Sequence, residues 1–109
     1  MKTFEGAKHD SGKLKYSHVP PEVIDAIAVI REYGNRKYSD PDNWRAIAPE
    51  RWHEALLRHT REIWNDPCHI DEESGLPSLW HLATNAAFLC ACLRPELEKA
   101  VEKKGGKEE

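Results

Sequence analysis

The chain lacks the cysteine pairs that a disulfide framework requires. Its three cysteines, Cys68, Cys90 and Cys92, are an odd number, and the last two lie two positions apart on a predicted helix, where their side chains point in different directions. We therefore expect small apolar core residues in a reducing cytoplasm. No apolar run approaches the roughly 18 residues of a membrane span, and the N-terminus has no signal-peptide core. These absences predict a cytoplasmic protein with no membrane partner.

A strong excess of either charge is also absent. The net charge of −3 does not favour a general nucleic-acid binder, which is usually basic, so no specific nucleic-acid binding is expected. The phosphate-binding loop pattern GxxxxGK[ST] does not occur. A chain of 109 residues predicts one domain with a modest core, which self-association would help to stabilise. We therefore expect a homo-oligomer.

The front of the chain predicts an extended arm followed by a helix. Residues 1–20 lack an apolar period and end in two prolines, which favour extended backbone. Lys13 in this arm can meet a phosphate as a point charge, and a solvated loop is the alternative. A helix is predicted from Pro21 to Tyr33, with Gly34 as its C-terminal stop. This helix is apolar on most sides, so we expect it to be central to the bundle.

Two further helices are predicted from Pro49 to Trp64 and from Pro77 to Leu93, and each carries a histidine among apolar neighbours. A helix advances about 100° per residue, so two stripes form. The first holds Trp52, Leu56, His59 and Ile63, and the second holds Ser78, His81, Asn85 and Phe88. If the helices pack antiparallel, the two histidines meet across a shared cleft. The alternative is that each is a core histidine satisfied by one hydrogen bond.

Asn85 is a further candidate, because it lies one turn from His81 in an otherwise apolar helix. A buried polar group without a partner costs roughly 1–3 kcal/mol, so such a residue needs a reason to be there.

The two connecting segments add further candidates. Residues 33–45 interleave Lys37 with Tyr38 and Trp44, the residue types that stack on a base and contact its phosphate. A surface loop whose aromatic residues cover the end of the bundle explains them equally well. Residues 65–76 form an acidic turn around Asp71 and Glu73, which either complements a helix dipole or holds magnesium or manganese.

The expected fold is all-α. It is a small bundle of three main helices in a single domain, residues 21–104, with an extended N-terminal arm over residues 1–20. A short charged helix of about ten residues begins at Pro95, and residues 105–109 form a flexible tail.

With these residues in view, the chain resembles the small phage family named for the N-terminal domain of dATP/dGTP diphosphohydrolases. The similarity runs from about Lys8 to Leu93 and rests on HDSGK, VPPEVIDAI, YGNRKYSDPDNW, ALLRH and DEESGLPSLWHLATNAAFL. The resemblance implies a phage protein in an infected bacterial cell. Family members tend to have a histidine where this chain has Ser78, so a metal site built on that position and His81 is not expected to be intact. The paired ExxE and ExxD motifs of all-α nucleoside triphosphate pyrophosphohydrolases are also missing around Glu54 and His81.

Three functions follow from these residues. The first is a nucleotide-binding protein that captures and sequesters a nucleotide, or a nucleotide-derived signal of host defence, without chemistry and without a certain cofactor. Its ligand-binding residues would be Lys13, Lys37, Tyr38, Trp44, Arg58, His59, His81 and Asn85, with Trp80 as another stacking surface. The second, implied by the resemblance, is a dATP/dGTP pyrophosphohydrolase dependent on Mg²⁺ or Mn²⁺, with Asp71, Glu73 and His81 at the metal and Glu54 as a base. The third is a structural or interaction module.

Overall fold

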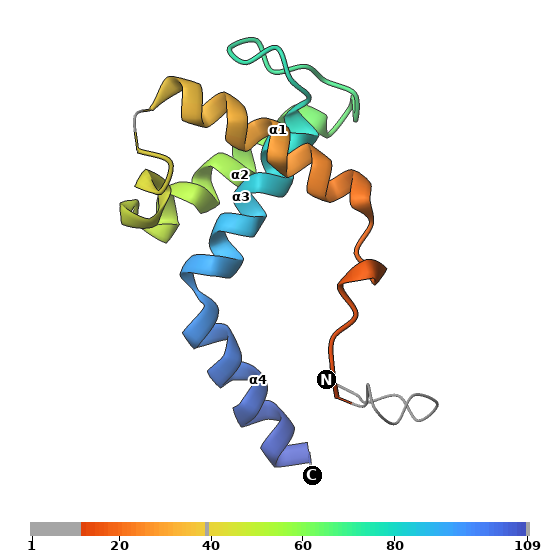
Figure 1. Cartoon of the computed structure of the whole chain (residues 1–109), viewed down its shortest axis with the longest axis vertical. Coiled ribbons are helices and arrows are strands. Elements are labelled where there is room, and N and C mark those ends of the chain that lie inside the picture. Colours follow the sequence, from red (N-terminus) through yellow and green to blue (C-terminus); the bar gives the residue numbers. More distant parts are fainter. Residues whose placement is uncertain (1–11, 39, 109) are drawn as a thin grey trace.

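The computed structural model describes residues 12–38 and 40–108, and it confirms an all-α protein with no strand in that part of the chain (Figure 1). Its elements are η2 (Tyr16–His18), α1 (Pro21–Lys37), η3 (Asn43–Ala46), α2 (Pro49–Ile63), α3 (Ser78–Cys92) and α4 (Arg94–Glu108). The predicted bounds of the second and third helices agree with α2 and α3 to within one residue at each end. Within the described residues, no helix is both long and apolar enough to cross a membrane.

The first helix continues past its predicted stop. Pro21 occupies the first turn and α1 then runs through Gly34 to Lys37, so the prediction that Gly34 ends the helix is wrong. A glycine stop requires the left-handed backbone conformation. Among the described glycines only Gly12 and Gly75 have a positive φ, and Gly34 stays helical. Arg36 and Lys37 instead place positive charge at the negative C-terminal end of the helix.

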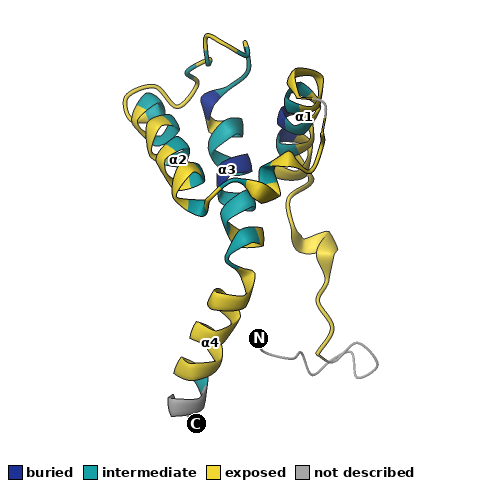
Figure 2. Ribbon diagram, turned by 90° about the vertical axis from the view of Figure 1, so that its left-hand side faces the viewer, coloured by how far each residue is buried: buried dark blue, intermediate teal, exposed yellow. Residues whose placement is uncertain are grey.

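The central element is α3, not α1 as predicted. Helices α1 and α2 both pack against α3, which lies between them (Figure 2). Helix α1 leaves Val23, Ile24 and Val29 exposed, so its apolar residues are not all needed by the bundle. The alanines of α3, such as Ala83 and Ala86, keep this helix narrow and allow a neighbour to approach on each side.

The interior is unusual in being as polar as it is apolar. Among the residues whose burial the structure describes, the buried ones are the hydrophobic Ala26 and Ile30 of α1 and the polar Ser78, Thr84 and Asn85, all three on α3. The cysteines contribute little to this interior, since Cys68 and Cys90 are exposed and Cys92 is half-buried. The expectation of core cysteines is therefore wrong for the first two.

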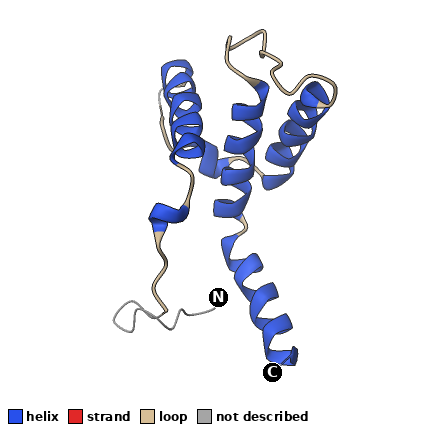
Figure 3. Cartoon of the chain, turned by 90° about the vertical axis from the view of Figure 1, so that its right-hand side faces the viewer, coloured by secondary structure: helices blue, strands red, loops and turns tan. Residues whose placement is uncertain are grey.

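The two ends of the described chain extend away from the bundle (Figures 1 and 3). Residues 12–20 are exposed, with one 3₁₀ turn at η2, and residues 1–11 of the predicted arm lie outside the described residues. Helix α4 packs on α3 and has 15 residues, more than the ten expected. It includes residues 105–108, which the sequence assigned to a tail.

Candidate functional site

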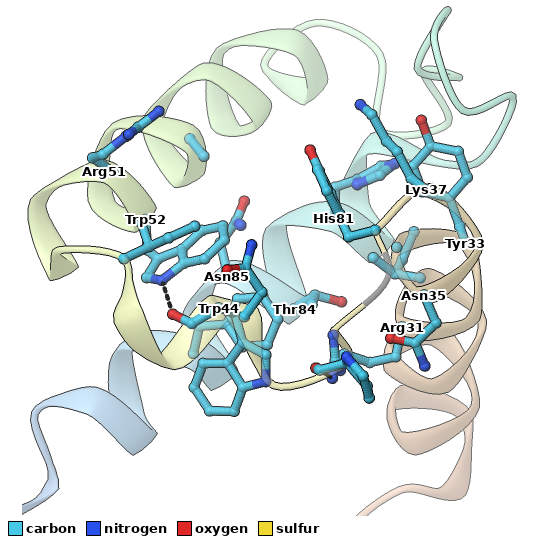
Figure 4. A pocket seen from close by; sticks show the side chains of 18 of the residues that line it. Arg31, Tyr33, Asn35, Lys37, Trp44, Arg51, Trp52, His81, Thr84 and Asn85 are labelled. Atoms are coloured by element: carbon cyan, nitrogen blue, oxygen red, sulfur yellow. Dashed lines mark hydrogen bonds between the residues drawn. The ribbon is translucent and has the colours of Figure 1, made fainter.

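A cavity of about 500 Å³ opens between α1 and α2, with α3 as its floor (Figure 4). Its lining includes the last turn of α1, the segment around η3, the first turns of α2, the acidic turn and the middle of α3. Eight predicted site residues line it: Lys37, Tyr38, Trp44, His59, Asp71, Glu73, His81 and Asn85. Three others, Lys13, Glu54 and Arg58, are exposed and lie outside the lining. The fold thus brings most of the predicted site residues, which come from separate segments of the chain, into one cavity.

The two histidines meet in this cavity, as the helical stripes predicted. The rings of His59 and His81 stack with their centroids 4.9 Å apart and their planes 17° from parallel. His81 Nε2 also lies 2.7 Å from Ser74 Oγ, and Tyr33 packs edge-on against the imidazole. Burial lowers the pKa of His81, and the neighbouring charge of His59 lowers it further. His81 is therefore neutral at pH 7 and can act as a hydrogen-bond acceptor or metal ligand.

A partly buried chain of hydrogen bonds runs from His59 toward the start of α3. His59 Nδ1 lies 2.9 Å from Glu62 Oε1, and Ser78 Oγ donates to the same carboxylate oxygen at 2.8 Å. His69 Nδ1 in turn lies 2.8 Å from Ser78 Oγ. The hydrogen bond from His59 is the largest of the effects that lower the pKa of Glu62, so this carboxylate stays ionised. Ser78, fully buried, thus holds the Glu62 carboxylate in place.

The acidic turn presents Asp71 to the cavity. Ser74 N donates to Asp71 Oδ2 at 2.9 Å, and Gly75 closes the turn by donating to the Asp71 carbonyl at φ +72°. Burial acts to raise the pKa of Asp71, but the hydrogen bonds from Ser74 and the nearby histidines outweigh it and lower that pKa. Glu73 also lines the cavity, where it forms an ion pair with Lys37.

These contacts change the candidate metal set. The predicted set was Asp71, Glu73 and His81. Within the described residues, the structure instead groups His59, Glu62 and Asp71, one donor atom from each, with all three atoms within 4.8 Å of one another. Glu73 is engaged by Lys37, and His81 Nε2 lies 3.8 Å from Asp71 Oδ2, next to the group.

An aromatic cluster of Trp44, Trp52 and Phe88 forms another wall of the cavity. Trp44 stacks on Phe88 with centroids 4.4 Å apart and planes 12° from parallel, and Trp52 packs tilted on Phe88 at 4.7 Å. The Arg45 guanidinium carbon lies 4.3 Å from the centre of the Trp44 ring. Contacts with Phe88 and Arg45 therefore occupy the faces of Trp44 that the sequence assigned to base stacking. Tyr38, half exposed at the cavity edge, is the more accessible aromatic surface.

The cavity floor carries an unsatisfied acceptor. Asn85 is only 7% exposed, and its Oδ1 is buried with no hydrogen-bond partner. The neighbouring Thr84 differs, because its Oγ1 donates to the Trp80 carbonyl at 3.0 Å within α3. An unpaired buried carbonyl costs about 1–3 kcal/mol, so a ligand that donated a hydrogen bond to it would remove this cost and bind more tightly.

Formal charges in the lining balance. Three cations face the cavity, Arg31, Lys37 and Arg51, against the three carboxylates Asp40, Asp71 and Glu73. Arg31 also lies 5.4 Å from the centre of the Phe88 ring and donates to the Pro41 carbonyl, so it is held at the aromatic wall. The lining can therefore contact an anion at several points but is not strongly positive.

Sequence reasoning did not identify several residues of the site, namely Arg31, Tyr33, Arg51, Glu62, His69 and Ser74. For Glu62 a signal existed, because its position three residues after His59 puts it on the same side of α2. The others reach the site through tertiary packing, for which the sequence pattern gives no indication.

The chain is similar to known phage proteins. The family model described as dATP/dGTP diphosphohydrolase, N-terminal, matches residues 3–100. The protein named dATP/dGTP diphosphohydrolase of Salmonella phage PMBT28 is 32% identical over 84 residues, which cover 77% of this chain and 28% of that relative. No solved structure matches. The chain therefore belongs to the family of dATP/dGTP diphosphohydrolase N-terminal domains.

Proposed function

We propose that this chain is a nucleotide-binding protein whose cavity captures and withholds a purine nucleotide. The observation that carries the proposal is Asn85 Oδ1, a buried acceptor with no partner on the floor of a cavity with aromatic residues. Both purines present N–H donors on their base-pairing edge, and an asparagine amide is a common partner of adenine. The cavity volume of about 500 Å³ lies within the range of small-molecule sites.

The remaining contacts favour a base on the aromatic side and phosphates toward the cations. Tyr38 and Trp52 line the same cavity as Asn85, and an aromatic surface stacks on any base. Arg31 and Lys37 lie on α1, Arg31 beside the Phe88 ring and Lys37 beside Tyr38, where they can contact the phosphate oxygens of a stacked nucleotide (Figure 4).

Native mass spectrometry and calorimetry test this proposal. Purified protein is analysed for a co-purified nucleotide, and binding of dATP, dGTP, dCTP and dTTP is then measured. We expect tighter binding of the purine nucleotides and a loss of at least tenfold in affinity for Arg31→Met. Arg58→Met is the matched control, because Arg58 is an exposed arginine outside the lining, and it should bind as the wild type does. Equal binding by both variants would contradict the placement of the ligand.

The second candidate is a metal-dependent dATP/dGTP pyrophosphohydrolase. The name of the phage relative and the grouping of His59, Glu62 and Asp71 favour it. Glu54, the base expected from the sequence, lies outside the cavity lining, so another group would have to take the proton. Incubation of dATP and dGTP with the protein and Mg²⁺ or Mn²⁺, followed by chromatography, separates the two proposals. Recovery of intact triphosphate supports sequestration, and release of the monophosphate, lost in Asp71→Asn, supports hydrolysis.

A further inference from the structure

We infer that His59, Glu62 and Asp71 form a binding site for a divalent transition-metal ion, selective for such ions over Mg²⁺. The inference concerns the free protein and does not depend on nucleotide binding. It starts from the spacing of the donor atoms, which lie within 4.8 Å of one another. Around one ion with bonds of about 2.1 Å, neighbouring donors are about 3 Å apart and opposite donors about 4.2 Å. Small side-chain rotations are therefore enough to bring all three donors onto one ion.

The donors are held in place by the chain itself. Glu62 accepts a hydrogen bond from the buried Ser78, which lies outside the group and is itself hydrogen-bonded to His69. Asp71 accepts from the backbone of Ser74 in a tight turn. Such outer contacts orient metal ligands in proteins and keep carboxylates ionised. The group is thus a mixed set from two elements, α2 and the acidic turn, in which each carboxylate has its own support.

The chemistry of the donors selects the class of ion. An imidazole nitrogen suits zinc, iron, nickel or copper, whereas Mg²⁺ takes oxygen ligands in a nearly ideal octahedron. One imidazole with two carboxylates also satisfies Mn²⁺ and Zn²⁺. His81 is stacked on His59 beside the group and offers a second imidazole nearby. Three protein ligands leave coordination positions open, and His59 and Asp71 both line the cavity.

The same cavity holds an independent indication of a ligand. Asn85 is more than nine-tenths buried and its Oδ1 is unpaired in the floor, so the cavity holds an acceptor that a donor on an added group could satisfy. The three cations and three carboxylates of the lining cancel in formal charge. A bound divalent ion would supply the positive charge that this balance withholds from an anionic ligand.

Electron paramagnetic resonance of free Mn²⁺ tests the site without any nucleotide. Protein freed of metal with a chelator is titrated with Mn²⁺, and the loss of the free-ion signal counts the bound ions. We expect one Mn²⁺ per chain, displaced by about one equivalent of Zn²⁺ but only by a large excess of Mg²⁺. Mg²⁺ that displaces Mn²⁺ as readily as Zn²⁺ does would overturn the inference, because it would indicate a site made of oxygens alone.

Three substitutions locate the ion. Glu62→Gln and Asp71→Asn keep an oxygen that can accept the existing hydrogen bonds but remove the charge, and each should weaken Mn²⁺ binding at least tenfold. Glu72→Gln is the matched control, because Glu72 lies in the same turn but is exposed and outside the group. The affinity of this variant for Mn²⁺ should stay within twofold of the wild-type affinity. Unchanged binding in both test variants would overturn the inference.

A measurement on the wild-type chain covers the case in which a variant fails to fold. Long-range ¹H–¹⁵N spectra of the histidine rings are recorded during a titration with diamagnetic Zn²⁺. The ring nitrogens of His59 should shift and reach their end point at one equivalent. His53, exposed on the same helix, should not shift in that range. A Zn²⁺ titration that moves His53 but not His59 would place the ion elsewhere and refute the site.

Discussion

Replacing Asn85 by leucine should make the free protein more stable and at the same time impair its proposed binding. Leucine has the same branching as asparagine, so it fills similar space on α3 without a polar atom. Asn85 Oδ1 is buried without a partner, and an unsatisfied buried acceptor costs about 1–3 kcal/mol. Removing that cost should raise the free energy of unfolding by about 1 kcal/mol, which corresponds to roughly 4–8 °C in Tm for a domain of this size.

The proposed ligand should respond in the opposite direction. A nucleotide N–H that donates to Asn85 in the complex would face a methyl group in the variant and remain unpaired. The affinity should then fall by about tenfold or more, since each 1.4 kcal/mol is one factor of ten. A residue that is costly to the fold and useful to the ligand is the expected signature of a binding site.

Urea unfolding and titration calorimetry measure the two effects on the same preparation. Asn65→Leu serves as the control, because Asn65 is exposed in the loop after α2 and does not line the cavity. Its stability should change by less than about 0.5 kcal/mol, with unchanged affinity. If Asn85→Leu destabilises the free protein by more than 1 kcal/mol, then the amide has a structural partner and the reasoning fails. Unchanged nucleotide affinity would equally refute the proposed contact.

Three further changes have definite signs. The pKa of His81 is lowered in the folded state, mainly by burial, so the unfolded chain binds more protons below about pH 6.5. The free energy of unfolding should therefore fall as the pH drops through 6.5, and urea titrations at pH 7.5 and 5.5 should show a smaller fall for His81→Gln. Gly34→Ala should stabilise by about 0.4–1 kcal/mol, because Gly34 is helical and its new methyl group meets no atom within 4 Å. Gly75→Ala should instead destabilise by about 1–2 kcal/mol, since φ is +72° and the space around it is open, so that only backbone strain acts. Thermal melts compare the two, and equal shifts would contradict the assigned backbone conformations.

The sequence predicted the two helices of the site well because their signals are local. Pro49 and Pro77 mark the starts of α2 and α3 to within one residue, and the 3.6-residue period places His59 and His81 on facing stripes. The C-terminal end of α1 was predicted too early, because a glycine allows a helix to end but does not require it to. The prediction that α1 is the central helix was wrong as well. An apolar α1 does not have to be central when the narrow, alanine-rich α3 can be approached on both sides.

The details of the site were less accessible to sequence reasoning, because they depend on which of several equivalent side chains turns inward. Asp71 and Glu73 are indistinguishable in an acidic run, yet one accepts from Ser74 beside the histidines and the other binds Lys37. Ser78 counted as a lost histidine in the family pattern. In the fold it is a buried donor to Glu62, a contact 16 residues apart in sequence.

The position of the polar residues on α3 makes the interior of this small fold less apolar than that of an ordinary helical bundle. Ser78, Thr84 and Asn85 occupy the helix between α1 and α2, where an ordinary small bundle would place leucine or isoleucine. Within the described chain, the buried hydrophobic residues are Ala26 and Ile30. The interior of the described chain thus surrounds a cavity and has few buried apolar residues, and a ligand that paired with Asn85 Oδ1 would add to the stability of the fold. A ligand present at 100 times its Kd would raise the free energy of unfolding by about 2.7 kcal/mol, which is a large share of the total stability of a small domain.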